Sequence, residues 1–172
     1  RTLAKMLDKQ GVQVKVIEKD AERSRMVAER IEEGIVVRGD GTDIDLLTQE
    51  GVGEADVVIC LTADDKLNLM LALLAKHLGA SRTIVRVARI EYVDLMEKVG
   101  VDIVLSSRLL AAGEILAFAR RGGVVSVALL EGAKAEAMEV IVQKGSYVEN
   151  KKLMDLQLQK ECLICAFVRD DE

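Results

Sequence analysis

The sequence predicts an α/β protein built on a doubly wound, parallel β-sheet. Short apolar runs of β character alternate with helical segments along residues 1–121, and strands separated by helices of this length are joined by parallel crossovers. One run, residues 12–20, has the pattern of a buried strand that ends on acidic residues just before a helix begins. Several helical runs are followed by a glycine, the residue that favours a left-handed C-terminal cap. These glycines are Gly11, Gly34, Gly51, Gly79 and Gly100.

The elements of this sheet follow one another in a regular order that begins with a helix. The apolar spacing of the helical segments predicts helices over residues 2–9, 21–33, 43–50, 64–78, 91–99 and 108–121. The intervening short runs, rich in Val and Ile, predict strands over residues 12–18, 35–38, 55–61, 83–87 and 102–105.

The first strand of such a sheet, with its glycine-rich phosphate loop, is expected to lie outside this sequence, because residues 2–9 already have a helical pattern. In the usual strand order 3-2-1-4-5-6, that strand would separate residues 14–17 from residues 57–61. We therefore expect these two segments to lie about 9 to 10 Å apart, without direct ladder hydrogen bonds between them.

The pattern changes after residues 120–123, Arg-Arg-Gly-Gly. Two strands, 124–130 and 138–143, follow without a long helix between them, and a turn at 144–146, a short helix at 152–156 and a strand at 162–169 come next. We predict a nucleotide-binding domain over residues 1–121, a linker or crossover over 122–135, and the start of a small α+β subdomain over 136–172. The chain is interpreted as a fragment at both ends.

Composition excludes several classes of function. The 172 residues are 50% apolar and 31% charged, which suits a folded domain with a real core. A net charge of -5 without a dense basic run argues against a nucleic-acid partner. No apolar stretch approaches the roughly 20 residues that cross a bilayer.

Three further patterns are given structural interpretations. Cys162 and Cys165 have C-x-x-C spacing, but on a predicted strand residues three apart point to opposite faces, so the thiols would not share a metal. Tyr147 and Lys151 have the spacing of a dehydrogenase pair but lie in a turn. His77 falls late on a helix, where it caps carbonyls or faces solvent.

Polar residues after the second and third strands of the predicted fold can bind a nucleotide. Glu18 ends a strand, so its carboxylate can accept hydrogen bonds from two ribose hydroxyls and would repel a 2′-phosphate; the alternative is a solvated acid beside Lys19. Asp40 can accept from an adenine amino group, with Thr42 beside it. A plain turn, with Thr42 or Asp43 capping the next helix, also fits that segment.

The fourth strand of the complete fold, over 55–61, borders the crevice where strand order reverses, which is where open α/β sheets bind ligands. Thr62 and Asp65 have the spacing of a capping box at the start of the helix over 64–78. Arg86, at the end of the fifth strand of the complete fold, fits either a ligand phosphate or an interface salt bridge.

Several blocks, taken together, match one known family in their order and spacing. The chain resembles the regulatory RCK (KTN) domains of bacterial potassium transport proteins, and most nearly those of Trk-type uptake systems. The matching blocks are residues 16–20 (VIEKD), 39–42 (GDGT), 61–68 (LTADDKLN), 73–80 (LLAKHLGA), 85–89 (VRVAR), 91–102 (EYVDLMEKVGVD) and 142–153 (VQKGSYVENKKL).

The resemblance implies a Rossmann-like fold and a nucleotide sensor. It implies that Thr62 and Asn68 face the nucleotide, NAD(H) or ATP/ADP, and that the chains assemble as homodimers and homotetramers. These assemblies lie on the cytoplasmic face of a membrane-embedded potassium-translocating subunit. The predicted nucleotide-binding residues are Glu18, Lys19, Asp40, Thr42, Thr62, Asn68 and Arg86.

No catalytic constellation is recognised in the sequence, so we predict a protein that is not an enzyme. The resemblance implies that it is a regulatory subunit that gates potassium uptake in response to a nucleotide. Its helix over 64–78 is apolar around more than one face, which indicates that it is deeply buried or shared between chains. Two alternatives stay open: a fragment of an NAD-dependent oxidoreductase, and an oligomerisation module without a ligand.

Overall fold

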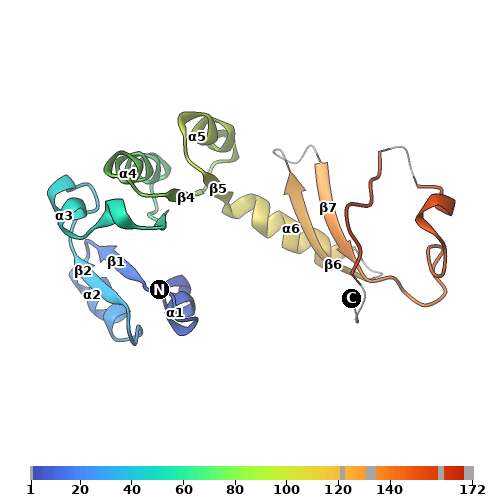
Figure 1. Cartoon of the computed structure of the whole chain (residues 1–172), viewed down its shortest axis with the longest axis horizontal. Coiled ribbons are helices and arrows are strands. Elements are labelled where there is room, and N and C mark those ends of the chain that lie inside the picture. Colours follow the sequence, from blue (N-terminus) through green and yellow to red (C-terminus); the bar gives the residue numbers. More distant parts are fainter. Residues whose placement is uncertain (1, 121–122, 131–134, 159–160, 169–172) are drawn as a thin grey trace. The chain divides into compact units, whose positions relative to one another are not determined.

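The computed structural model describes residues 2–120, 123–130, 135–158 and 161–168. The chain divides into two compact units, residues 1–111 and 112–172, and each is described by itself. Figure 1 shows the alternation of helices and strands in the first unit and the hairpin of the second.

The first unit alternates helices and strands in the predicted order. Its elements are α1 (Thr2–Lys9), β1 (Lys15–Glu18), α2 (Ala21–Ala28), β2 (Ile35–Arg38), α3 (Ile44–Gln49), the 3-10 helix η1 (Val52–Glu54), β3 (Val57–Cys60), α4 (Asp65–Leu78), β4 (Arg82–Val87), the 3-10 helix η2 (Ile90–Tyr92), α5 (Val93–Val99) and β5 (Ile103–Ser106). Helix α6 (Ser107–Ala119) begins in this unit and continues into the second.

Every strand pairing in the described part of the first unit is parallel, which confirms the predicted α/β class. β1 pairs with β2, and β3, β4 and β5 pair in that order. No ladder joins β1 to β3 among the described residues, as expected if these strands are not direct neighbours. Helix α2 packs against β1 and β2, and α4 packs against β3 and β4.

Several predicted boundaries in this unit are wrong. The strand over 12–18 begins only at Lys15, and the helix over 21–33 ends at Ala28. The helix is cut short because the buried carboxylate of Asp8, in α1, accepts hydrogen bonds from the backbone amides of residues 32, 33 and 34, at 2.7, 3.3 and 2.8 Å. Those amides therefore have a partner outside the helix, and the chain turns toward β2. The helix over 91–99 is divided into η2 and α5.

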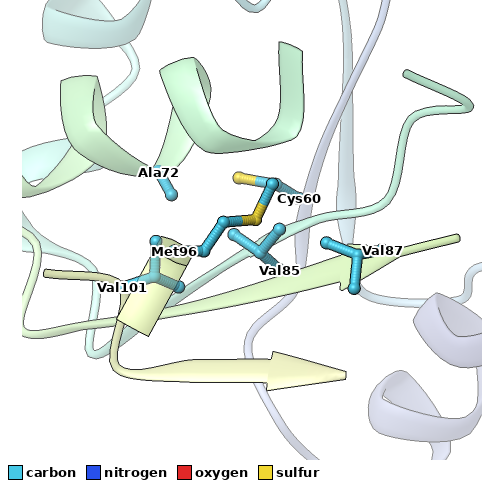
Figure 2. Close-up of a cluster of buried hydrophobic side chains, with 6 residues drawn as sticks. All are labelled: Cys60, Ala72, Val85, Val87, Met96 and Val101. Atoms are coloured by element: carbon cyan, nitrogen blue, oxygen red, sulfur yellow. The ribbon is translucent and has the colours of Figure 1, made fainter. Parts of the chain in front are cut away.

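The main core lies between the three-stranded sheet and helices α4 and α5. It consists of Cys60, Ala72, Val85, Val87, Met96 and Val101. Figure 2 shows the side chain of Met96 extending from its helix toward Cys60 and Val85. A second cluster, formed by Leu47, Val52, Ala75 and Ala80, packs against the partly buried Leu74 and Leu78 of α4 and against Ile17 and Val58 of the strands.

The second unit contains the rest of α6 and an antiparallel hairpin. β6 (Val124–Leu130) pairs with β7 (Ala135–Val140), with a register shift between Val124 and Ser126. β6 therefore occupies much of the segment 122–135, which the sequence suggested as a linker. Gly113 of α6 lies close to β6, because a Cβ at this position would meet the carbonyl oxygen of Val127 at 2.5 Å.

Three predictions for this second unit are wrong. The strand expected over 138–143 ends at Val140 and starts earlier, because residues 135–140 pair with β6. The helix over 152–156 is a single 3-10 turn, Leu153–Asp155. Residues 162–168 form no strand, since no described segment pairs with them, and residue 169 lies outside the described residues. The helix over 108–121 is α6, and residue 121 also lies outside them.

Candidate functional site

The carboxyl ends of β1 and β2 bring three of the predicted binding residues close together. Glu18 ends β1 and is half-buried, and its Oε1 accepts a hydrogen bond from the backbone N–H of Asp20 at 2.9 Å. Lys19 Nζ donates to Asp40 Oδ2 at 2.7 Å. Glu18 is aligned with Arg38 at the end of the β1–β2 ladder. Lys19 therefore lies one residue beyond the end of β1, and Asp40 lies two residues beyond the end of β2.

Asp40 organises the turn after β2. Its Oδ1 accepts from the backbone N–H of Thr42 at 3.0 Å and from the Thr42 hydroxyl at 2.8 Å. The hydrogen bond from Lys19, followed by those from Thr42, holds the pKa of Asp40 well below its usual range, and the bond to Asp40 raises the pKa of Lys19. The helix cap is Asp43, whose carboxylate accepts from the backbone amides of Asp45 and Leu46. Asp40 is therefore ionised and presented on an ordered turn.

At the ends of β3 and β4, Asn68 joins two backbone segments. Its Oδ1 accepts from the backbone N–H of Thr62 at 2.8 Å, and its Nδ2 donates to the carbonyls of Thr62 and Arg86 at 3.1 and 2.9 Å. Asn68 has no exposed surface. In this arrangement it contacts the protein's own backbone.

The side chains of Thr62 and Arg86 remain partly exposed at this edge. Arg86 Nη1 lies 3.4 Å from the carbonyl oxygen of Thr62, and Nη2 lies 3.5 Å from the hydroxyl of Ser107, the first residue of α6. These contacts are long for hydrogen bonds, so the guanidinium keeps donors for another acceptor. The Thr62 hydroxyl lies 3.2 Å from the backbone N and O of Asp64.

Two aspartates at the start of α4 have roles that differ from the predicted capping box. Asp64 is the N-cap, with Oδ1 accepting from the amides of Lys66 and Leu67. Asp65 is buried and accepts from the backbone amides of Ala88 and Arg89, at 2.9 to 3.1 Å, in the loop after β4. The pairing of Thr62 with Asp65 as a capping box is wrong, because Asp65 bonds a loop distant in sequence. The local sequence carries no signal of this role, because Asp64 and Lys66 on either side of Asp65 are also charged.

Helix α4 faces the sheet with small and polar residues rather than with leucines. Its buried residues are Asp65, Asn68, Ala72 and Ala75. On another side, Lys66, Leu69, Met70, Leu73 and Leu74 line a shallow, largely apolar depression of about 320 Å³. The leucine-rich surface of this helix is thus partly open in a single chain.

Among the described residues, the three cysteines, the Tyr147–Lys151 pair and His77 form no reactive group. Burial raises the pKa of the Cys60 thiol to about 11, so it stays neutral. Cys162 and Cys165 are free and exposed, and among the described residues no set of three or more His, Cys, Asp or Glu side chains could hold a metal ion. Lys151 Nζ lies 3.4 Å from the ring centroid of Tyr147, within a segment of turns. His77 is exposed in the last turn of α4.

The chain matches a protein-family model and several curated relatives. A family model described as the TrkA-N domain matches residues 1–107. The Trk system potassium uptake protein TrkA homolog 2 of Methanosarcina mazei is 39% identical over 171 residues, covering 99% of this chain and 38% of that protein. The Trk system potassium uptake protein TrkA of Vibrio alginolyticus is 35% identical over 174 residues, with the same two coverages of 99% and 38%. The chain therefore spans well under half of the length of these relatives.

Solved structures share the fold. The TrkA-N domain of the inner membrane protein ybaL from Escherichia coli superposes with a TM-score of 0.63 at 17% identity, covering 69% of this chain and 87% of that domain. The GsuK channel bound to NAD gives a TM-score of 0.59 at 24% identity, over 68% of this chain and 21% of the channel. GsuK bound to ADP gives 0.58 at 24% identity, over 68% and 31%. No helix within the described residues is both long enough and apolar enough to cross a membrane.

Proposed function

The chain belongs to the TrkA-N domain family, and we propose that it is the nucleotide-sensing part of a regulatory subunit that gates a potassium uptake transporter. The ligand we propose is NAD(H) or ATP/ADP. The relatives are named for potassium uptake, and GsuK, which has a similar fold, is bound to NAD in one structure and to ADP in another.

The observation that carries this proposal is the set of polar groups at the carboxyl edge of the parallel strands. Glu18 offers a carboxylate at the end of β1, where the fold places the ribose hydroxyls of a dinucleotide. Asp40, on its ordered turn, offers a second acceptor, and Arg86 offers a cation with free donors at the end of β4. Acceptors for ribose and base together with a cation for phosphate match the polarity of a nucleotide.

We propose binding without turnover. A sensor of this kind acts because its ligand binds two conformations of the protein with unequal affinity. Continuity of α6 from the end of β5 into the second unit offers a covalent route from the site to the rest of the molecule. Within the same proposal, the protein is cytoplasmic and sits peripherally at the inner face of the cell membrane, bound to the potassium-translocating subunit.

Replacing the ribose acceptor tests the ligand assignment. Glu18→Ala should weaken binding of NADH or ATP to the intact protein by about 1 to 3 kcal/mol, the scale of a hydrogen bond to a charged group. Isothermal titration calorimetry measures the effect, and Glu97→Ala, which removes an exposed acid from α5, is the matched control. Equal affinities of wild type and Glu18→Ala would exclude Glu18 from the site.

We also propose assembly through the leucine-rich surface of α4. Met70, on this surface, is 49% exposed in the single chain, so Met70→Glu should place a charge in an apolar contact between chains and dissociate the assembly. Light scattering on the intact protein reports the change in mass. Met6→Glu, at a methionine of α1 with 56% exposure, is the control, and an unchanged mass for Met70→Glu would rule out this surface.

A further inference from the structure

We propose that Asn68 is a positioning residue of the nucleotide site, acting on Thr62 and Arg86 through their backbones rather than by touching the ligand. The inference rests on the proposed function and assigns a specific task to one side chain of the site. It differs from the role that the family resemblance implied, in which Asn68 faces the nucleotide.

The hydrogen bonds of Asn68 leave it no N–H donor to offer a ligand. Both N–H donors of a carboxamide are used when Nδ2 donates to the carbonyls of Thr62 and Arg86, at 3.1 and 2.9 Å. Its oxygen accepts from the Thr62 amide at 2.8 Å. The side chain is also fully buried, so a bound nucleotide would have to displace protein to reach it.

Asn68 acts at the point where the ladder between β3 and β4 ends. The register between β3 and β4 runs from Val57–Arg82 to Cys60–Val85. Thr62 and Arg86 follow these last paired residues, and beyond them the ladder no longer fixes the spacing between the two segments. Asn68 supplies the missing link, because one carboxamide bonds the backbone of both segments.

Small residues on α4 make this link possible. Ala72 and Ala75, one and two turns after Asn68 on the same face, have 0% and 1% of their surface exposed. Their short side chains let the helix lie close to β3 and β4, which brings a residue as short as Asn within reach of the strand ends. Asp65, on that face, adds bonds to the loop after β4 through the amides of Ala88 and Arg89.

The functional consequence concerns the guanidinium of Arg86. This group lies 3.4 Å from the Thr62 carbonyl, so its location depends on the spacing between the two backbones that Asn68 joins. Without the carboxamide, the Thr62 loop and the end of β4 can separate, and the guanidinium and the Thr62 hydroxyl are no longer presented together. Affinity for an anionic ligand should then fall although no ligand contact has been removed.

A comparable polar link at the opposite end of β4 provides the control. Thr83 is fully buried, and its amide and hydroxyl donate to Asp102 Oδ2 at 2.8 and 2.9 Å, joining the amino ends of β4 and β5. Thr83→Val removes the hydroxyl while keeping the shape of the side chain. It perturbs a buried polar contact at the end of β4 opposite to Arg86.

The experiment measures NADH and ATP affinity of the intact protein by calorimetry, together with thermal unfolding of the unliganded protein. Asn68→Ala should bind about tenfold to a hundredfold more weakly, the range expected if the Arg86 guanidinium loses one charged hydrogen bond to the ligand. Thr83→Val should keep the wild-type affinity whatever its effect on unfolding. Asn68→Ser, which keeps a hydroxyl for one backbone partner but is too short to join both segments, provides a second variant should Asn68→Ala not fold.

Double-mutant cycles identify the residue through which Asn68 acts. The losses caused by Asn68→Ala and Arg86→Gln should be non-additive, because both disturb the same guanidinium, whereas the losses caused by Asn68→Ala and Glu18→Ala should add. Full additivity with Arg86→Gln, or wild-type affinity in both Asn68 variants, would overturn the positioning role. A wild-type protein that binds neither nucleotide would instead overturn the proposed function.

Discussion

The described residues of the first unit form two buried apolar clusters, whereas those of the second unit leave most of their large apolar side chains at the surface. In the first unit, Met96 and Val85 are 2% and 0% exposed. In the second, Val127 is the one buried hydrophobic residue among those described, while large side chains such as Phe118, Met154 and Leu163 are mostly exposed.

This difference shows that each unit is stabilised by its own kind of interaction. The first has two buried clusters and buried polar side chains that link separate segments, so a replacement there removes packing or hydrogen bonds. The second depends on the β6–β7 ladder, on the close approach of Gly113 to β6, and on the ion pair between Arg120 and Glu136 at 2.7 Å. Substitutions should therefore have very different effects in the two units.

The sharpest test compares two methionines. Met96→Ala should lower the free energy of unfolding of the first unit by about 2 to 5 kcal/mol, because it removes a buried side chain and leaves a cavity. Met154→Ala, at a position that is 85% exposed, should change the free energy by no more than about 0.5 kcal/mol. Urea unfolding followed by circular dichroism measures both, and similar losses would show that the proposed contrast is wrong.

A smaller loss is expected from the closest packing contact of the second unit. In Gly113→Ala, the new Cβ would lie 2.5 Å from a backbone carbonyl of β6, so helix or hairpin must move. Overpacking of this kind costs about 1 to 3 kcal/mol, of which the better helix propensity of Ala recovers up to about 1 kcal/mol. Hydrogen exchange of the β6 and β7 amides should accelerate.

The control for this variant is Glu114→Ala, which changes an exposed residue of the same helix. It should leave exchange in the hairpin unchanged. Unaltered protection in Gly113→Ala would mean that the approach of α6 to β6 contributes nothing to this unit.

The smallest effect is a pH dependence confined to the first unit. The hydrogen bond from Lys76, followed by those from the Thr83 amide and hydroxyl, lowers the pKa of Asp102 from its ordinary 3.8 to about 2. Because the ionised carboxylate is favoured by folding, its stabilising contribution is complete above the ordinary pKa and is lost as the pH falls toward about 2. Asp102→Asn should remove this part of the acid-induced loss of stability.

Unfolding midpoints measured across that acidic range test the assignment. Lys76→Met should also flatten the dependence, since it removes the main cause of the lowered pKa. If the unfolding midpoint of Asp102→Asn depended on pH as steeply as that of the wild type, the sign or the site of the effect would be wrong. Hydrogen exchange in the hairpin of the second unit should not respond to either variant.

Much of the first unit was determined by local sequence. The alternation of Val- and Ile-rich runs with helical segments predicts parallel strands, and that prediction is confirmed. Gly79 and Gly100 have φ angles of 116° and 113° in the helix caps where the sequence suggested them. Glu18 ends a strand as expected. These features depend on periodicity and on conformational preference within a few residues, which a sequence displays directly.

Tertiary structure alone decided the features that depend on partners distant along the chain. Helix α2 ends early because Asp8 bonds amides 24 to 26 residues away. Asp65 bonds the loop after β4 instead of capping its own helix, and Asn68 points into the protein to join Thr62 to Arg86. The spacing of residues on a helix shows which side chains share a face, but which backbone groups lack partners there is set only when strands and helices pack. That is why the sequence could suggest the residues of the candidate site and only the structure could assign them different tasks.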